Sequence, residues 1–218
     1  MKKISSPKEA VSHIHDGAVL MIGGFMCCGQ PLRLIEELLK QGAKGLTVIT
    51  NDAGFPERGV GKLVVAGRVR RLVASHIGLN PVAGQRMHSG AMAVDLIPQG
   101  TLAERIRCAG AGLGGILTPT GLGTEAESGK RKIDVDGRKY ILETPLKADF
   151  ALVKVSVCDR CGNGFIAKAA KNFNPLMAMA AQHTIAEADE LVEIGALDPE
   201  RVTLPGVFVN TVAFEVRR

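Results

Sequence analysis

One segment near the N-terminus, residues 18–50, most strongly constrains the fold of this chain. It begins with consecutive apolar residues, Ala18 to Ile22, which is typical of a strand covered on both faces. A glycine-rich loop follows, and Pro31 then opens an amphipathic helix that is expected to stop at Gly42. Leu46 to Thr50 forms a second buried strand. This strand, loop, helix and strand order is a βαβ unit with a right-handed crossover, so the sequence predicts an α/β fold.

The remainder of the chain continues the same alternation of short strands and helices. An Asp136-Gly137 pair between two extended runs, 133–135 and 138–142, predicts an antiparallel hairpin with a primed turn. We therefore expect a single domain over residues 1–218: one open, mostly parallel sheet with helices on both faces and an antiparallel hairpin decorating it. The other predicted strands are 70–75, 94–97, 151–157 and a terminal extended segment 207–216, and the other predicted helices are 7–15, 101–108 and 175–182.

The composition is that of an ordinary globular protein, with 46% hydrophobic and 22% charged residues. No apolar run approaches the roughly 20 residues that a membrane helix needs. Lys2-Lys3 is not followed by an apolar signal core. Five cysteines without the spacing of a small disulfide scaffold favour a reducing compartment. We expect a soluble, cytoplasmic protein with no membrane partner.

The net charge of +5 is mildly basic and favours an anionic ligand without identifying one. Two basic clusters, Arg68 to Arg71 and Lys130 to Lys132, resemble a nucleic-acid footprint at first sight. Aromatic residues do not interleave them, however, and no predicted helix carries a basic stripe. We therefore expect no nucleic-acid partner.

The strongest local motif is the loop Gly23-Gly24-Phe25-x-x-x-Gly29-x-Pro31 between the first strand and its helix. Glycines let a backbone approach a ligand closely, and amides at a helix start that lacks a capping side chain can meet a phosphate or an oxyanion. A tight strand-to-helix turn without any ligand explains the same glycines about equally well. A Walker loop is excluded, because Gln30-Pro31 stands where Lys and Ser or Thr are required.

Other glycine and cysteine motifs are weaker. The run Gly110 to Gly115 matches a dinucleotide fingerprint by letter but follows a helix instead of a strand. Six of the fourteen residues 110–123 are glycine, so we expect a long mobile loop there, which lies over a site, at a subunit contact or simply at the surface. Cys158-x-x-Cys161 is a single pair without further ligands at workable spacing, so no metal or redox role is assigned. Cys27 and Cys28 suit close packing better than thiol catalysis.

Polar residues follow three of the predicted strands. Asn51-Asp52, His76 and Gln99 each come where an apolar run ends. Ligands of open parallel sheets gather beyond the carboxyl ends of the strands, so the amides there are candidates to orient a carbonyl or carboxylate. Turn or capping duty is the alternative for Asn51-Asp52, and an isolated histidine is more often a hydrogen-bonded rim residue than a base.

Seven longer strings extend through most of the chain. They are Asp16-Gly17-x-x-Leu20-Met21-Ile22-Gly23-Gly24-Phe25-x-x-x-Gly29-x-Pro31, Thr50-Asn51-Asp52, Ser75-His76-Ile77-Gly78-x-Asn80-Pro81, Pro98-Gln99-Gly100-Thr101-Leu102, Gly112-Leu113-Gly114-Gly115, Lys171-Asn172-Phe173-Asn174-Pro175 and Leu204-Pro205-Gly206. The first string resembles the alpha-subunit signature of family I coenzyme A transferases, and the others continue the likeness. Within that family, the chain is most similar to the enzymes that move CoA between acetoacetate, butyrate and acetate.

The resemblance implies an α/β domain that pairs with a homologous beta subunit in a hetero-oligomer. In that family, acyl-CoA and a free carboxylate exchange partners through an acyl-glutamyl anhydride and a glutamyl-CoA thioester. The nucleophilic glutamate lies in a Ser-Glu-Asn-Gly string on the beta part, and this sequence has no such string. The resemblance therefore implies no catalytic nucleophile in this chain and no cofactor, since coenzyme A is a substrate.

The resemblance also implies a set of binding residues. Asn51 and Gln99 stand where the family places amides beside the reacting acyl group, and the glycine loop stands where it contacts CoA. The loop residues are Gly23, Gly24, Phe25, Met26, Cys27, Cys28 and Gly29.

Two other functions remain open from sequence. Similar α/β domains bind sugar phosphates as non-catalytic sensors in transcription regulators, although no DNA-binding helix pair precedes Asp16. The same exchange chemistry also serves the alpha chains of acyl-carrier lyases, which are usually much longer.

Overall fold

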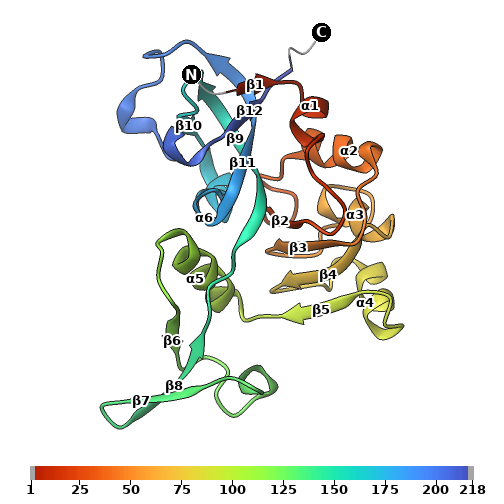
Figure 1. Ribbon diagram of the computed structural model, residues 1–218, viewed down its shortest axis with the longest axis vertical. Helices are drawn as coiled ribbons and strands as arrows, with labels where there is room; N and C mark the ends of the chain where they lie inside the picture. The colour runs from red at the N-terminus through yellow and green to blue at the C-terminus, as the bar shows by residue number, and fades with distance from the viewer. Residues whose placement is uncertain (1–2, 216–218) are drawn as a thin grey trace.

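The computed structural model describes residues 3–215 and is built on one large parallel sheet (Figure 1). Every pairing along the eight-strand path of this sheet is parallel, and one short strand is added antiparallel to β9. The sheet therefore has one edge at which all the carboxyl ends of the path meet. The order is β1 (Lys3–Ser5), β12 (Thr211–Ala213), β11 (Ala181–Val192), β9 (Ala148–Asp159), β2 (Val19–Ile22), β3 (Leu46–Thr50), β4 (Val69–Ala74) and β5 (Ala93–Leu96), with β10 (Gly164–Phe165) beside β9.

Two hydrophobic cores, one on each face of the sheet, confirm the predicted layers. Side chains alternate along β2, so that Leu20 and Ile22 join one core while Met21 joins the other. The first core is closed by α1 (Pro7–Val11), α2 (Leu32–Gln41), α3 (Val60–Val65) and α4 (Pro81–His88), and the second by α5 (Gln99–Gly110) and α6 (Asn174–Ala180). Single 3₁₀ turns lie at Glu125–Glu127, Lys168–Lys171, Pro199–Arg201 and Gly206–Phe208.

The predicted hairpin is present, but it does not decorate the main sheet as expected. Its turn residues Asp136 and Gly137 have φ angles of 52° and 76°, as a primed turn requires. The hairpin strands β7 (Lys132–Val135) and β8 (Arg138–Glu143) pair with β6 (Ile116–Thr118) in a separate three-stranded antiparallel sheet. Figure 1 shows this small sheet projecting from the body below α5.

The glycine run after α5 is shorter than the long mobile loop expected from its composition. Gly110 still belongs to α5, and β6 already begins at Ile116. The amides of Ala111 and Leu113 donate to the carbonyls of Arg107 and Cys108, which closes the end of the helix. Only residues 111–115 connect the two elements.

The sequence missed the long strand β11 as well as α3 and α4, and it misjudged both ends of the chain. Acidic residues interrupt the apolar pattern of β11, and α3 and α4 have only six and eight residues. The helix predicted over 7–15 ends at Val11, because Ser12 already caps it. Of the extended segment predicted over 207–216, only 211–213 pairs in the sheet, and residue 216 lies outside the described residues.

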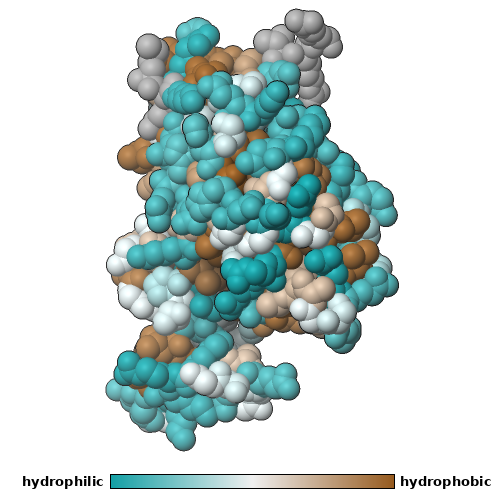
Figure 2. All heavy atoms as spheres, turned by 45° about the vertical axis from the view of Figure 1, so that its right-hand side comes forward, coloured by the Kyte–Doolittle hydropathy of each residue, from teal (hydrophilic) through white to brown (hydrophobic). Residues whose placement is uncertain are grey.

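The surface face in Figure 2 is mostly hydrophilic, with small separated apolar patches. Among residues 3–215, no helix is both long enough and apolar enough to cross a membrane.

Two helical glycines make a matched test of this packing. A Cβ added at Gly61 would lie 1.9 Å from the carbonyl oxygen of Phe55, whereas one added at Gly84 would meet nothing within 4 Å. We expect Gly61→Ala to lower the free energy of unfolding by about 1–3 kcal/mol through overpacking. Gly84→Ala should raise it by about 0.5–1 kcal/mol, because alanine loses less backbone entropy on folding. Urea denaturation of both variants measures the two changes in the free energy of unfolding. Equal changes would contradict the packing described around α3.

Candidate functional site

The glycine loop is a closed hairpin at the carboxyl end of β2. Phe25 and Cys28 exchange two backbone hydrogen bonds of 3.0 and 2.8 Å. Met26 and Cys27 occupy the turn with φ angles of 46° and 66°, which Gly or Asn usually adopts. The side chains of Phe25 and Met26 are 43% and 44% exposed, so the loop presents an apolar tip to its surroundings.

Most backbone amides of this loop are already bonded inside the protein. The amides of Phe25 and Cys28 close the hairpin, and three more donate to acceptors elsewhere in the chain. Within residues 3–215, only the amides of Cys27 and Gly29 in this loop have no acceptor. The three outward donors are Gly23 N to Leu152 O, Gly24 N to Asn172 Oδ1 and Met26 N to Asp52 Oδ2.

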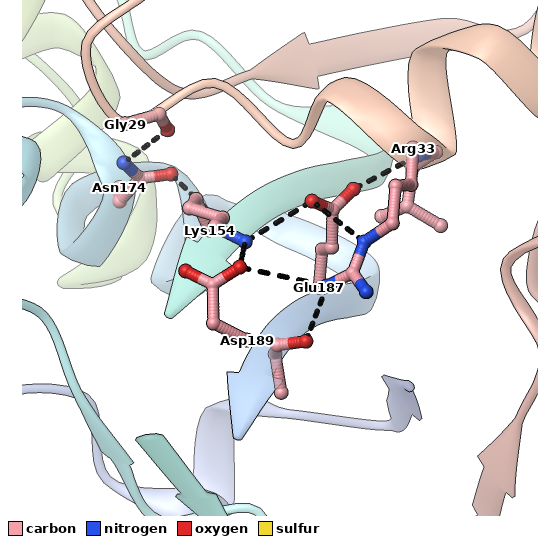
Figure 3. Close-up of polar contacts among 8 residues, drawn as sticks. Gly29, Arg33, Lys154, Asn174, Glu187 and Asp189 are labelled. Atoms are coloured by element: carbon pink, nitrogen blue, oxygen red, sulfur yellow. Dashed lines mark hydrogen bonds and ion pairs between the residues drawn. The ribbon is translucent and has the colours of Figure 1, made fainter. Parts of the chain in front are cut away.

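The start of α2 limits the expectation that its amides are available to a ligand, because the Leu34 amide is already bonded. Pro31 provides no side-chain cap, as predicted. The Leu34 amide nevertheless donates to Glu187 Oε2 on β11 at 2.9 Å. The Glu187 carboxylate is 2% exposed and also pairs with Arg33 at 3.4 Å and Lys154 at 3.1 Å (Figure 3). The anion that the helix dipole favours is therefore supplied by the protein itself.

Asn51 lies at the carboxyl end of β3 with its side chain fixed. It is 2% exposed, and its Oδ1 accepts a 2.9 Å hydrogen bond from Ser75 Oγ, which follows β4. No acceptor for Asn51 Nδ2 is present among residues 3–215. Asn51 thus offers a fixed amide donor at the edge of the sheet where the sequence placed it.

The neighbouring carboxylate, Asp52, stabilises a turn, which is one of the roles that the sequence left open for it. It is fully buried and accepts from the Met26 amide at 2.9 Å and from the Gly54 amide at 2.8 Å. Asp52 therefore ties the loop after β2 to the loop after β3. His76 contributes its carbonyl to the Ala53 amide at the same edge.

Gln99 is the first residue of α5 and follows β5, two strands away from β3 in the sheet. With about 4.8 Å between strands, the ends of β3 and β5 are about 10 Å apart. The Gln99 side chain is exposed and has no described partner within residues 3–215. A groove of about 510 Å³ lies between the first turns of α5 and β6. Gly100, the residue after Gln99, is one of the residues that line it. The structure thus places Asn51 and Gln99 on one edge of the sheet, but it leaves Gln99 without restraint.

Burial disfavours reaction at two of the cysteines, Cys27 and Cys158. Cys27 is buried, and burial raises the pKa of its thiol. Burial also raises the pKa of Cys158 to about 12. The turn between Cys158 and Cys161 is organised by Asp159, which accepts from the Cys161 amide. No group of three or more His, Cys, Asp or Glu residues that could hold a metal occurs among residues 3–215.

The sequence and the fold of this chain are similar to those of known proteins. A family model described as coenzyme A transferase matches residues 4–214. This chain belongs to the coenzyme A transferase family. It is 50% identical over 210 residues to the acetate CoA-transferase subunit alpha of Escherichia coli K12, covering 96% of each chain. It is 49% identical over 204 residues to the acetoacetyl-CoA:acetate/butyrate CoA transferase alpha subunit of Clostridium acetobutylicum, covering 94% of each chain.

A solved structure shows the same fold. The acyl-CoA transferase from E. coli O157:H7, crystallised as a thioester complex with CoA, superposes with a TM-score of 0.84 at 22% identity. The match covers 98% of this chain and 47% of the other, so this CoA-transferase chain spans about half of that structure's length. The family assignment and the close relatives support a transferase over the sensor and lyase alternatives.

Thiol labelling tests the burial of the cysteines in this CoA-transferase subunit. At pH 8, we expect a maleimide to modify the exposed Cys28 at least about 100-fold faster than Cys158, because a raised pKa leaves almost no Cys158 thiolate to react. Peptide mass spectrometry over time measures both rates. Comparable rates in the folded protein would contradict this arrangement, and unfolding in urea should equalise them.

Proposed function

We propose that this chain is the alpha subunit of a two-subunit enzyme that exchanges CoA between a short-chain acyl-CoA and a free carboxylate. Acetoacetyl-CoA or butyryl-CoA is the expected donor and acetate the expected acceptor. The names of the two relatives, at 50% and 49% identity over nearly the whole chain, support these substrates. The sequence strings that resemble the short-chain enzymes belong to the same likeness and indicate the same substrates.

One observation carries the proposal that the nucleophile comes from another chain. The edge of the sheet holds hydrogen-bond donors, namely Asn51 Nδ2 and the free side chain of Gln99. Two buried carboxylates, Asp52 and Glu187, accept hydrogen bonds from the loop and from the helix that follows it. Both are therefore already bonded to partners within the protein. We infer that a beta subunit supplies the glutamate, as the absence of a Ser-Glu-Asn-Gly string also suggests.

The proposed reaction proceeds in balanced steps. The partner's glutamate attacks the thioester carbonyl, the CoA thiolate leaves, and an acyl-glutamyl anhydride forms. The thiolate then attacks the glutamyl carbonyl, which releases the first carboxylate and leaves a glutamyl-CoA thioester. The second carboxylate reverses both steps. CoA is returned intact to a new acyl group, so it is a substrate and no cofactor is required.

The residues of this chain would act on the charge that develops in these steps. Each attack builds negative charge on a carbonyl oxygen, and a fixed donor such as Asn51 Nδ2 can be worth about 3 kcal/mol there. Gln99 would complete the donor set once a partner restrains it. The loop 23–29 would contact CoA mainly through its exposed apolar tip, since most of its amides are already bonded.

The proposed partner is a homologous beta subunit in a hetero-oligomer. The chain covers only 47% of the E. coli O157:H7 acyl-CoA transferase, which leaves room for a second unit of similar size in that protein. Both named relatives are themselves alpha subunits.

This division of the site predicts that the purified chain alone transfers no CoA. An assay with acetoacetyl-CoA and acetate, following acetyl-CoA by liquid chromatography, should show no product until the beta subunit is added. The same preparation must gain activity on reconstitution, which excludes misfolding as the cause. Transfer by the isolated chain would disprove the division between two subunits.

We also predict that Gln99→Ala lowers kcat/KM of the reconstituted enzyme by about 10²-fold, because a donor to the developing oxyanion is lost. The fold should remain intact, since Gln99 is exposed and has no described partner within residues 3–215. Gln85→Ala, at an exposed position of α4, is the matched control and should leave the rate unchanged. A rate for Gln99→Ala within threefold of wild type would remove Gln99 from the site.

A further inference from the structure

The glycine loop is held by a segment that lies almost 150 residues away in the sequence. Asn172 contacts both of its strands. Its Oδ1 accepts from the Gly24 amide at 3.2 Å, and its Nδ2 donates to the Cys28 carbonyl at 3.0 Å. The same side chain is tied to its own turn through the Ala169 carbonyl at 2.9 Å. One amide group therefore bridges the start and the end of the hairpin.

A second asparagine fixes the base of the loop. Asn174 is fully buried, and its Nδ2 donates to the Gly29 carbonyl at 2.9 Å. Its Oδ1 accepts from the Lys154 amide on β9 at 2.9 Å, as Figure 3 shows. Asn174 also packs directly against Gly23, the first residue of the loop, because a Cβ added at Gly23 would lie 1.9 Å from Asn174 Oδ1. The loop and the sheet thus share one hydrogen-bonding centre.

The Lys154 side chain extends this attachment to the helix that follows the loop. Its Nζ pairs with Glu187, and Glu187 accepts from the Leu34 amide of α2. Asn174 on α6 therefore holds the end of the loop, while Glu187 on β11 holds the start of α2, the helix that follows it. Figure 3 shows these groups converging beneath the loop.

The hairpin needs such restraint because of its own backbone. Met26 and Cys27 both have positive φ, which costs energy for side chains other than glycine and persists only when the surroundings enforce it. The Asp52 carboxylate holds the Met26 amide from one side, and Asn172 holds the hairpin strands from the other. Without these contacts, the apolar tip would have no fixed place relative to Asn51.

We propose that Asn172 and Asn174 are positioning residues for CoA transfer, which hold the glycine loop so that its tip places the thioester against the donors Asn51 and Gln99. The proposal rests on the proposed function. Neither asparagine touches the reacting atoms. Both act through the loop backbone, and a misplacement of about 1 Å at a reacting centre can cost about 10²-fold in rate.

Asn172 is the better residue to test. It is only partly buried, whereas loss of the fully buried Asn174 would leave backbone groups unsatisfied in the core. Asn163, in the turn between β9 and β10, provides a matched control. It is also partly buried, and its Oδ1 accepts from the Gly206 amide at 2.9 Å while its Nδ2 donates to Asp159.

The experiment compares Asn172→Ala and Asn163→Ala in the enzyme reconstituted with its beta subunit. We expect Asn172→Ala to lower kcat per assembled complex by about 10- to 100-fold. The KM for acetoacetyl-CoA should change by less than about threefold, because a displaced thioester loses transition-state stabilisation more than ground-state binding. Hydrogen exchange should be faster at the Gly24 and Cys28 amides in Asn172→Ala alone. Asn163→Ala should leave kcat and these amides unchanged.

Each outcome decides a separate point. A normal kcat for assembled Asn172→Ala, or an equal loss of kcat in both variants, would overturn the positioning role. Unchanged exchange at Gly24 would show that Asn172 does not hold the loop, and this also overturns the proposal. A wild-type complex without transfer activity would instead refute the proposed function, and that control is measured before the variants are compared.

Discussion

The parallel direction of the eight strands along the path of the main sheet is the constraint on which the rest of the structure depends. Parallel strands bring their carboxyl ends to one edge, so the loops after β2, β3, β4 and β5 must meet there. Residues that are 48 positions apart, such as Asn51 and Gln99, thereby share one surface. The same constraint places the Asp52 carboxylate against the Met26 amide of the neighbouring loop.

A consequence of this arrangement is a rigid site rather than an open anion cradle. The favoured anion at the start of α2 is Glu187 of the protein itself, held further by Arg33 and Lys154. The glycine loop uses most of its amides to maintain its own shape. Within residues 3–215, what remains for a ligand is an apolar tip, the unbonded backbone amides of Cys27 and Gly29, and the side-chain amides of Asn51 and Gln99. Such a surface can orient a thioester, which fits the CoA-transferase family, and we propose that another chain completes the reaction.

The local elements were predictable where a single pattern decided them. The βαβ unit, the stop of α2 at Gly42 and the Asp136-Gly137 hairpin all follow from residues adjacent in the sequence. The long strand β11 was missed because its acidic residues disrupt the apolar pattern. Glu187 is one of them, and its partners lie on α2 and β9. No local rule could indicate that a buried carboxylate there caps a helix 153 residues away.

The sequence by itself determined the fold class, the position of the glycine loop and the polar residues at the strand ends, because alternation, turn chemistry and strand order are encoded locally. Only the tertiary structure decided which groups of the site are free. Hydrogen-bond partners such as Asn172 for Gly24, or Glu187 for Leu34, come from distant segments that are brought together by packing. Whether an amide or a carboxylate can meet a ligand depends on those partners, and so availability is a property of the folded chain.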